Sequence, residues 1–110
     1  MERKEFEMRS KKQVIDELDR VEKEIEIKEH VLGEECQEAK DLQARLDVLV
    51  FAKSLFEKDN DYMKIENKSQ LYELLGRYEF KKSKFEVLSP DWRDQNVRLW
   101  AIRWILEMNG

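Results

Sequence analysis

The sequence predicts an all-α domain of about four helices, and its composition and length support this. Its 110 residues include only three Gly and one Pro, which is typical of long helices rather than of sheets. Charged residues make up 42% of the chain and hydrophobic residues 41%, with three Trp, three Tyr and five Phe. Disordered acidic chains carry less apolar and aromatic material, so we expect a folded core. The length is that of a single domain over residues 1–110.

The formal net charge of −4 is concentrated in the N-terminal half. Residues 1–58 hold 12 Lys and Arg against 16 Asp and Glu, whereas residues 59–110 hold 9 of each. Nucleic-acid affinity rests largely on the neutralisation of phosphates by Lys and Arg. The charge balance therefore makes nucleic acid the less favoured class of partner.

Cysteine content and hydropathy indicate a compartment. The single cysteine, Cys36, cannot form a disulfide within the chain, and no N-terminal segment has the pattern of a secretory signal. The longest apolar run, residues 48–52, is far shorter than the roughly 20 residues that span a bilayer. We therefore expect no membrane span and a cytoplasmic protein, which would mean the host cytoplasm if the source is a virus.

The first helix is predicted to begin at Lys11. Ser10 is a good N-cap residue and Gln13 follows three positions later, the spacing of a capping box. Residues 1–9 before it are expected to form a flexible tail, although the alternation at Phe6 and Met8 also allows a short edge strand.

An apolar seam with steps of three and four residues runs through residues 11–57, the pattern of coiled-coil packing. Its members are Val14, Leu18, Val21, Ile25, Leu32, Ala39, Leu42, Leu46, Leu49 and Phe56. The seam predicts either a helical hairpin or one long coiled-coil helix.

Gly33 decides between these two interpretations. The common register on both sides of it favours the long helix, in which the glycine would cost only about 1 kcal/mol relative to Ala. A turn at residues 31–36 is favoured because Gly commonly follows a helix end, and because His30 and Glu34 suit the helix termini that they would flank. The segment 46–56 is apolar nearly all round and needs more than one covering neighbour. We therefore expect the hairpin.

A polar loop is predicted at residues 58–67, followed by a C-terminal helical part at residues 68–110. Asn67 and Gln70 repeat the capping-box spacing, which predicts a third helix starting near Lys68. Its apolar face holds Leu71, Leu74, Leu75 and Tyr78. This helix either ends near Phe80 or continues towards Leu88, a stretch whose alternation also allows a short strand.

The last helix has the clearest start signal in the chain. Ser89 suits the N-cap, Pro90 the first helical position, and Asp91 the positive end of the helix dipole. One predicted face holds Val97, Trp100, Ala101, Trp104, Ile105 and Met108, and it is widened by Leu99, Ile102 and Leu106. So broad an apolar surface predicts a core helix or an interface helix.

Residues for catalysis are scarce. The chain has one His and one Cys, and the acidic residues around Cys36 disfavour the thiolate that an active cysteine needs. We found no glycine-rich phosphate loop, zinc-finger spacing or nucleophile elbow. We therefore expect no enzymatic activity and no cofactor.

Two patterns resemble metal sites only weakly. Glu26, His30 and Glu34 are spaced four apart, so an unbroken helix would place them on one face as a possible divalent-metal triple. A solvated charged face is the favoured interpretation. Residues 59–70 begin like a calcium loop but lack the glycine at the sixth position and the glutamate at the twelfth. We expect no metal at either place.

A basic segment with interleaved aromatic residues lies at residues 77–85. Basic and aromatic side chains together are the ingredients of a surface for single-stranded nucleic acid. The members that would contact it are Arg77, Tyr78, Lys81, Lys82 and Lys84. This is the alternative function, and its competing interpretation places the aromatic side chains in the core and the lysines in water.

The favoured hypothesis is a non-enzymatic protein–protein interaction module, such as a small adaptor, regulator or inhibitor. We expect it to bind another protein and to self-associate through the apolar surplus of residues 46–56 and 97–108. The candidate interface residues are Trp92, Trp100, Trp104, Met108, Phe51 and Leu55. Small charged helical proteins of this kind are frequent among viral accessory proteins, which is an association rather than a deduction.

Overall fold

The computed structural model describes residues 8–33, 36–58 and 63–107. These residues form four helices, α1 (Lys11–Leu32), α2 (Gln37–Ser54), α3 (Ile65–Ser83) and α4 (Pro90–Ile105). The predicted all-α fold with about four helices is confirmed. No strand occurs in these three ranges, so the short strand that alternation allowed after Phe80 does not form.

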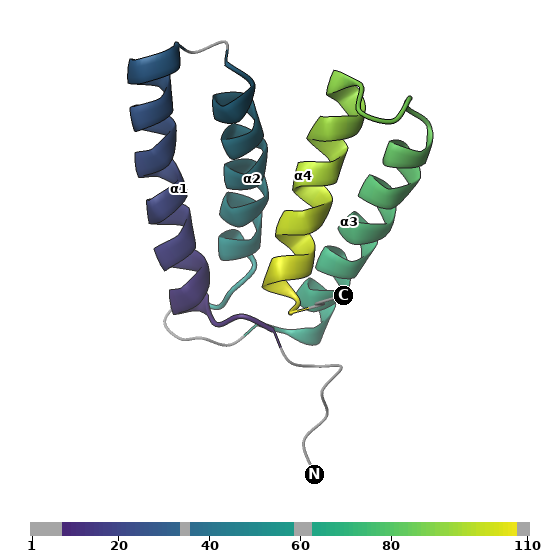
Figure 1. Ribbon diagram of the computed structural model, residues 1–110. Coiled ribbons are helices and arrows are strands. Elements are labelled where there is room, and N and C mark those ends of the chain that lie inside the picture. Colours follow the sequence, from purple (N-terminus) through teal and green to yellow (C-terminus); the bar gives the residue numbers. More distant parts are fainter. Residues whose placement is uncertain (1–7, 34–35, 59–62, 108–110) are drawn as a thin grey trace.

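The helices form two antiparallel hairpins that pack side by side. Hairpin α1–α2 and hairpin α3–α4 meet through α2 and α4, so the spatial order is α1, α2, α4, α3 (Figure 1). The inner helices α2 and α4 have two neighbours each, whereas α1 and α3 are the outer helices. Both hairpin turns lie at the same end of the molecule, at the top of Figure 1.

The predicted start of α1 is confirmed in detail. The hydroxyl of Ser10 accepts a hydrogen bond from the backbone N–H of Gln13 at 3.1 Å, and the Gln13 side chain accepts one from the N–H of Ser10 at 2.8 Å. The two residues thus satisfy each other's unpaired backbone donors. The first four residues of the predicted seam are buried as expected, namely Val14, Leu18, Val21 and Ile25.

The chain turns at Gly33, so the hairpin is correct and the single long helix is wrong. Gly33 has φ +94 and ψ 158, a backbone region that is almost restricted to glycine. Its N–H donates to the carbonyl of Glu29 at 2.9 Å and closes the last turn of α1. Cys36 then caps α2, because its sulfur accepts from the N–H of Ala39 at 3.3 Å. The last seam residue of α1, Leu32, is exposed because the helix ends there.

The predicted start of α3 is wrong. The helix begins at Ile65, and its N-cap residue Lys64 makes no capping hydrogen bond through its side chain. The Asn67 side chain, which we expected to cap the helix, donates to the carbonyl of Leu55 at 3.0 Å. The last carbonyls of a helix have no partner within it, so a donor brought close by the tertiary fold competes with the local cap. The helix continues beyond Phe80 and ends at Ser83.

The predicted face of α4 is only partly correct. Ser89 caps the helix by accepting from the N–H of Trp92 at 3.2 Å, as expected. The buried residues of the helix, however, are Leu99, Ala101, Ile102 and Ile105, while Trp100 is 54% exposed. Because α4 lies between two helices, the aliphatic side chains fill the narrow spaces and the tryptophans lie at the edges. Helix α4 ends at Ile105, and Met108 lies outside the described residues.

Backbone contacts join the two hairpins at the end opposite to their turns. The N–H of Arg9 donates to the carbonyl of Ile105 at 2.7 Å, and its guanidinium donates to the carbonyl of Trp104 at 3.0 Å. At the same end, the ammonium of Lys11 donates to the carbonyls of Glu57 and Lys58, which ties the start of α1 to the segment that follows α2. Arg9, which we had assigned to the tail, is therefore attached to the end of α4, and residues 1–7 of that tail lie outside the described residues.

Candidate interaction surfaces

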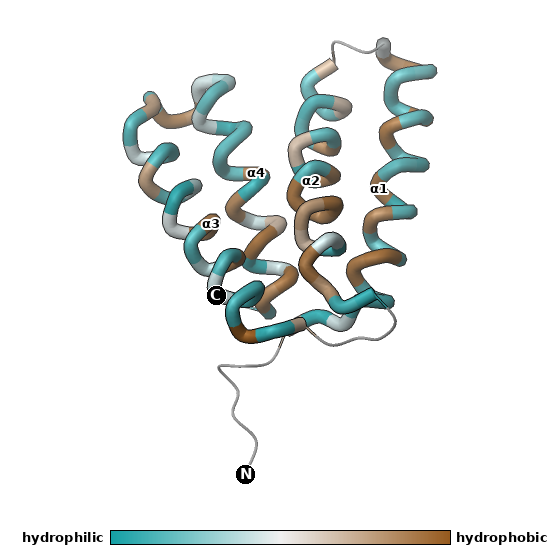
Figure 2. Tube along the Cα trace, turned by 180° about the vertical axis from the view of Figure 1, so that it is seen from behind, coloured by the Kyte–Doolittle hydropathy of each residue, from teal (hydrophilic) through white to brown (hydrophobic). Residues whose placement is uncertain are grey.

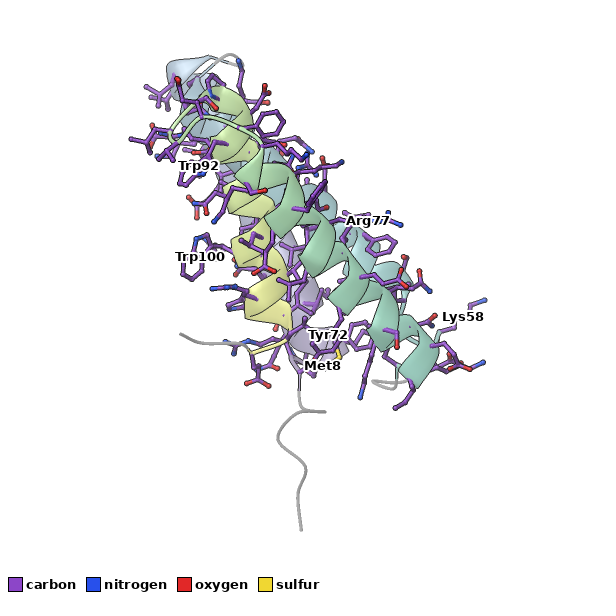
Figure 3. The ribbon with its side chains drawn as sticks, turned by 90° about the vertical axis from the view of Figure 1, so that its right-hand side faces the viewer. Met8, Lys58, Tyr72, Arg77, Trp92 and Trp100 are labelled. Atoms are coloured by element: carbon purple, nitrogen blue, oxygen red, sulfur yellow. The ribbon has the colours of Figure 1, made fainter. Side chains whose placement is uncertain are left out.

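The predicted interface residues lie in different environments. Leu55 belongs to the core and is only 9% exposed, so little of it is available to a partner in this fold. Phe51, one helical turn earlier, is partly exposed, and so is Trp92 at the start of α4. Figure 3 shows Trp92 and Trp100 on one face of the molecule and Arg77 on the opposite face.

Trp104 has a structural role that the sequence did not indicate. The guanidinium of Arg9 lies 4.6 Å from the centroid of its ring, and that of Arg45 lies 5.4 Å from it. Arg45 also donates to the carboxylate of Glu17 in α1 at 3.1 Å. Trp104 thus links α4 to the first hairpin and is only partly exposed, which makes it a poor candidate for contact with a partner.

Glu17 receives hydrogen bonds from two arginines in this network. Arg20, one turn further along α1, donates to it at 2.6 Å, and Arg45 donates from α2. The hydrogen bond from Arg20 is the main cause that holds the pKa of Glu17 below its usual value, against the effect of burial, and Arg45 adds to it. The carboxylate therefore stays ionised at neutral pH and holds α1 against α2.

Exposed apolar side chains gather at the turn between α3 and α4. We define the α3–α4 tip as Phe80, Phe85, Val87 and Leu88. Phe80 is 62% exposed, Val87 68% and Leu88 70%. The hydrophobic colour of this turn is visible in Figure 2. From the sequence we expected Phe80 and Phe85 to lie in the basic aromatic segment 77–85, and Val87 and Leu88 were not predicted to form an interface.

The backbone of the α3–α4 tip is unusual at Leu88. Its φ is +69, in the left-handed region, where an L side chain costs about 1 kcal/mol or more and Gly or Asn is the usual residue. The side chain gains little from packing, because most of it is exposed. Neither the backbone nor the core therefore explains a leucine at this position.

The turn of the first hairpin carries a smaller apolar group. Ile27, Val31 and Leu32, in the last turns of α1, are more than half exposed. They lie at the same end of the molecule as the α3–α4 tip (Figure 1). Among the described residues, this end is therefore richer in exposed apolar side chains than the end where the hairpins are joined.

The basic aromatic segment is divided between different parts of the surface. Arg77, Tyr78 and Lys81 line a hollow of about 330 Å³ between α3 and α4. Lys82 points elsewhere, since its ammonium lies 5.4 Å from the centroid of Trp92 and donates to Asn96 at 3.2 Å. The ammonium of Lys84 lies 4.6 Å from the centroid of Phe80. The five residues that we grouped for nucleic-acid contact do not form one platform.

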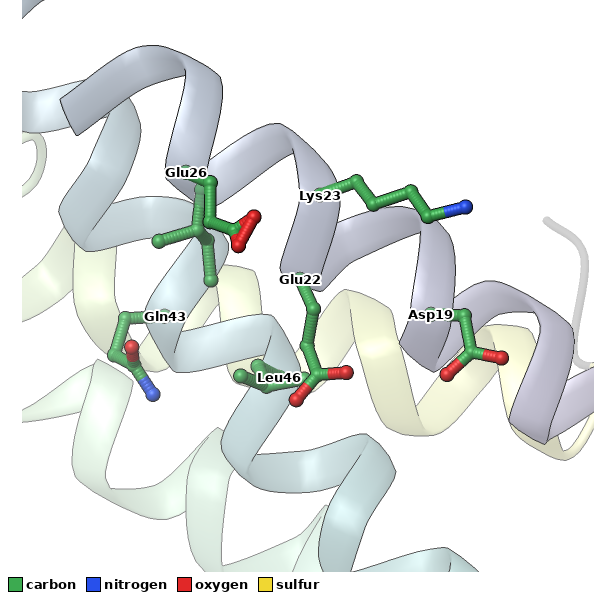
Figure 4. Close-up of a pocket in the computed structure, with 7 residues that line it drawn as sticks. Asp19, Glu22, Lys23, Glu26, Gln43 and Leu46 are labelled. Atoms are coloured by element: carbon green, nitrogen blue, oxygen red, sulfur yellow. The ribbon is translucent and has the colours of Figure 1, made fainter. Parts of the chain in front are cut away.

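The residues with metal-ligating side chains are also separated. Glu26 lines a hollow of about 510 Å³ between α1 and α2 together with Asp19 and Glu22 (Figure 4), but His30 does not line it. Glu34 and the possible calcium-loop residues Asp59 and Asp61 lie outside the described residues. In the part of the chain that the structure describes, no three His, Cys, Asp or Glu side chains are placed to hold a metal ion.

Comparisons of the chain with protein-family models, with curated proteins and with solved structures found no match. Among the described helices, none combines the length and the apolar content that a crossing of the bilayer requires. A functional interpretation therefore rests on the surfaces described above.

Proposed function

We propose that this protein is a non-enzymatic interaction module of the cytoplasm, an adaptor, regulator or inhibitor, and that it binds another protein through the α3–α4 tip. The observation that carries the proposal is Leu88, an exposed leucine in a backbone conformation that favours glycine. Residues held in strained backbone conformations cluster at functional sites.

The α3–α4 tip has the properties of a small binding hot spot. Full burial of an aliphatic or aromatic side chain contributes roughly 1.5–3 kcal/mol, so Phe80, Val87 and Leu88 together would support appreciable affinity. The cap of α4 by Ser89 and the rigid Pro90 hold the turn in place. Little conformational entropy would be lost on binding, which favours recognition by such a turn.

Affinity capture from a lysate of the source cells, with variants of the α3–α4 tip, tests this proposal. We expect Leu88→Gly and Val87→Ser to lose a protein that the unchanged chain retains. Ile65→Ser is the matched control, because Ile65 is also an exposed aliphatic residue but lies at the start of α3, away from the tip. Equal capture by all variants would contradict binding through the tip.

The stability of Leu88→Gly separates a functional role from a structural one. The substitution removes the strain at positive φ and should leave the chain at least as stable as before. Loss of binding together with unchanged or raised thermal stability would support the proposal. A clear loss of stability would show that Leu88 is needed for the fold and would count against it.

Self-association through residues 46–56 and 97–108 stays a prediction. Much of that apolar surplus packs inside the chain itself, since Val48, Leu49, Ile102 and Ile105 are fully buried. What remains exposed includes Val50, Phe51 and Trp100. By light scattering, we expect the unchanged chain to have the mass of an oligomer. The double variant that carries both Phe51→Ser and Trp100→Ser should have the mass of a monomer. A monomeric unchanged chain would remove self-association from the proposal.

A further inference from the structure

A groove runs along α3 on the face opposite to Trp92 and Trp100. The hollow of about 330 Å³ described above lies between α3 and α4, and Asp94, Gln95 and Arg98 of α4 line it. A smaller hollow of about 110 Å³ lies between α3 and α2, where Phe51 lines it. The two hollows share Leu74 and Arg77, so we treat them as one feature, the α3 groove.

Two cations of the α3 groove have no ion-pair partner among the described residues. Arg77 and Lys81 are exposed, lie one helical turn apart on α3, and form no ion pair with any residue in the described ranges. Figure 3 shows Arg77 projecting away from the helices. Side chains in this arrangement present two adjacent positive charges to one anionic ligand.

Arg98, the third cation of the groove, is already paired. It donates to Asp94 at 3.0 Å and to Asp47 at 3.2 Å. Burial works against its charge, but Asp94 and, less strongly, Tyr78 outweigh burial and raise the pKa of Arg98. Arg98 therefore serves the fold, and the charge available to a ligand comes from Arg77 and Lys81.

A buried acceptor lies in the lining of the same groove. The side-chain oxygen of Gln95 is buried and accepts no hydrogen bond within the described structure, although the amide nitrogen donates to Asp94 at 3.3 Å. Unpaired buried acceptors are rare because their desolvation is not compensated. A ligand that brings an N–H donor next to its anionic group would satisfy this oxygen once the Gln95 side chain turns towards the groove, because the oxygen itself has almost no exposed surface.

We propose that the α3 groove binds an acidic peptide segment of a partner protein. Its carboxylates would pair with Arg77 and Lys81, a backbone N–H would donate to Gln95, and an apolar side chain would contact Leu74 and Phe51. A peptide with a few carboxylates fits better than nucleic acid, because Asp94 and Glu73 also line the groove and the two unpaired cations are too few to neutralise a continuous row of phosphates. This site contains none of the α3–α4 tip residues, but it shares Phe51 with the surface proposed for self-association, so Phe51 is left unchanged in the test below.

Fluorescence anisotropy with the full chain tests the site. The probe is a labelled, N-acetylated peptide of Glu and Leu, compared with the same peptide carrying Lys for Glu and with a single-stranded oligothymidylate of equal length. We expect binding of the acidic peptide only, and a loss of affinity of about tenfold in Arg77→Gln with Lys81→Gln. Gln95→Leu should also weaken binding, because it removes the acceptor.

The matched control is Lys23→Gln with Lys53→Gln, which changes the net charge equally at two exposed lysines outside the groove. Affinity of this control should stay within about twofold of the unchanged chain, as expected for remote charges screened by salt. Equal weakening in both double variants would show non-specific attraction and would overturn the site. Tighter binding of the oligothymidylate, or no binding of the acidic peptide, would also overturn it.

Discussion

The two hairpins differ in how completely their side chains serve the fold. In the first hairpin, both helices begin with a side-chain cap, and Glu17 joins α1 to α2 through Arg45. In the second hairpin, α3 begins without a side-chain cap and buries only Leu71 and Leu75. The α3–α4 tip and the α3 groove both lie in this second hairpin. The comparison indicates that the first hairpin stabilises the molecule, whereas the second supplies surfaces for recognition.

Truncation of the core should have the largest effect and should distinguish the two hairpins. Leu49 of α2 is fully buried in the core, so Leu49→Ala is expected to cost about 3 kcal/mol in the free energy of unfolding. Phe80→Ala, at the exposed tip, should cost less than about 0.5 kcal/mol. Urea denaturation measures both values. Similar losses for the two variants would contradict the conclusion that the first hairpin stabilises the molecule and the α3–α4 tip does not.

Removal of the charge at Glu17 should have a moderate effect that depends on pH. Because folding lowers the pKa of Glu17, its ionised form stabilises the fold above the unfolded value near 4.5, and this contribution is lost as the pH falls through the folded pKa. We expect Glu17→Gln to cost about 1–2 kcal/mol at pH 7, since the carboxylate is 14% exposed and paired with two arginines. The difference from the unchanged chain should shrink in acid below the folded pKa. Thermal melts at several pH values provide the test, and a difference that persists in acid would contradict the role of the charge.

Two glycine substitutions should act in opposite directions. Gly33→Ala places a side chain at a φ of +94 and should destabilise the first hairpin by about 1–2 kcal/mol through backbone strain. Gly76→Ala lies inside α3, where an added Cβ meets nothing within 4 Å, and should stabilise it by about 0.5–1 kcal/mol. Denaturant midpoints of the two variants should therefore move apart. Movement in the same direction would mean that the turn or the helix is not formed as described.

The smallest expected effect concerns the groove acceptor. Replacement of Gln95 by Leu removes a buried oxygen without a partner, and the free energy of unfolding should change by less than about 0.5 kcal/mol or rise slightly. A loss larger than about 1 kcal/mol would show that the Gln95 side chain is satisfied within the fold. That outcome would remove one of the arguments for a peptide ligand.

Local signals in the sequence predicted the helix ends well where one residue interacts only with the backbone next to it. Ser10 and Ser89 cap their helices as expected, and Gly33 makes the turn. The same logic failed at Asn67, because a carbonyl at the end of α2 competes for its side chain. The surfaces were predicted least well. Trp100 was expected on the main face of α4, and the tip leucine, Leu88, was not singled out.

The sequence by itself determined the helical class, the seam of the first hairpin and the position of its turn, because helix caps, apolar spacing and glycine conformation act over a few residues. Only the tertiary structure decided which side of α4 is buried, since a helix that is apolar nearly all round has no preferred face until its neighbours are placed. The α3 groove depends on tertiary structure for the same reason. Arg77 and Gln95 are distant in the sequence, and they line one hollow only because α3 and α4 pack together.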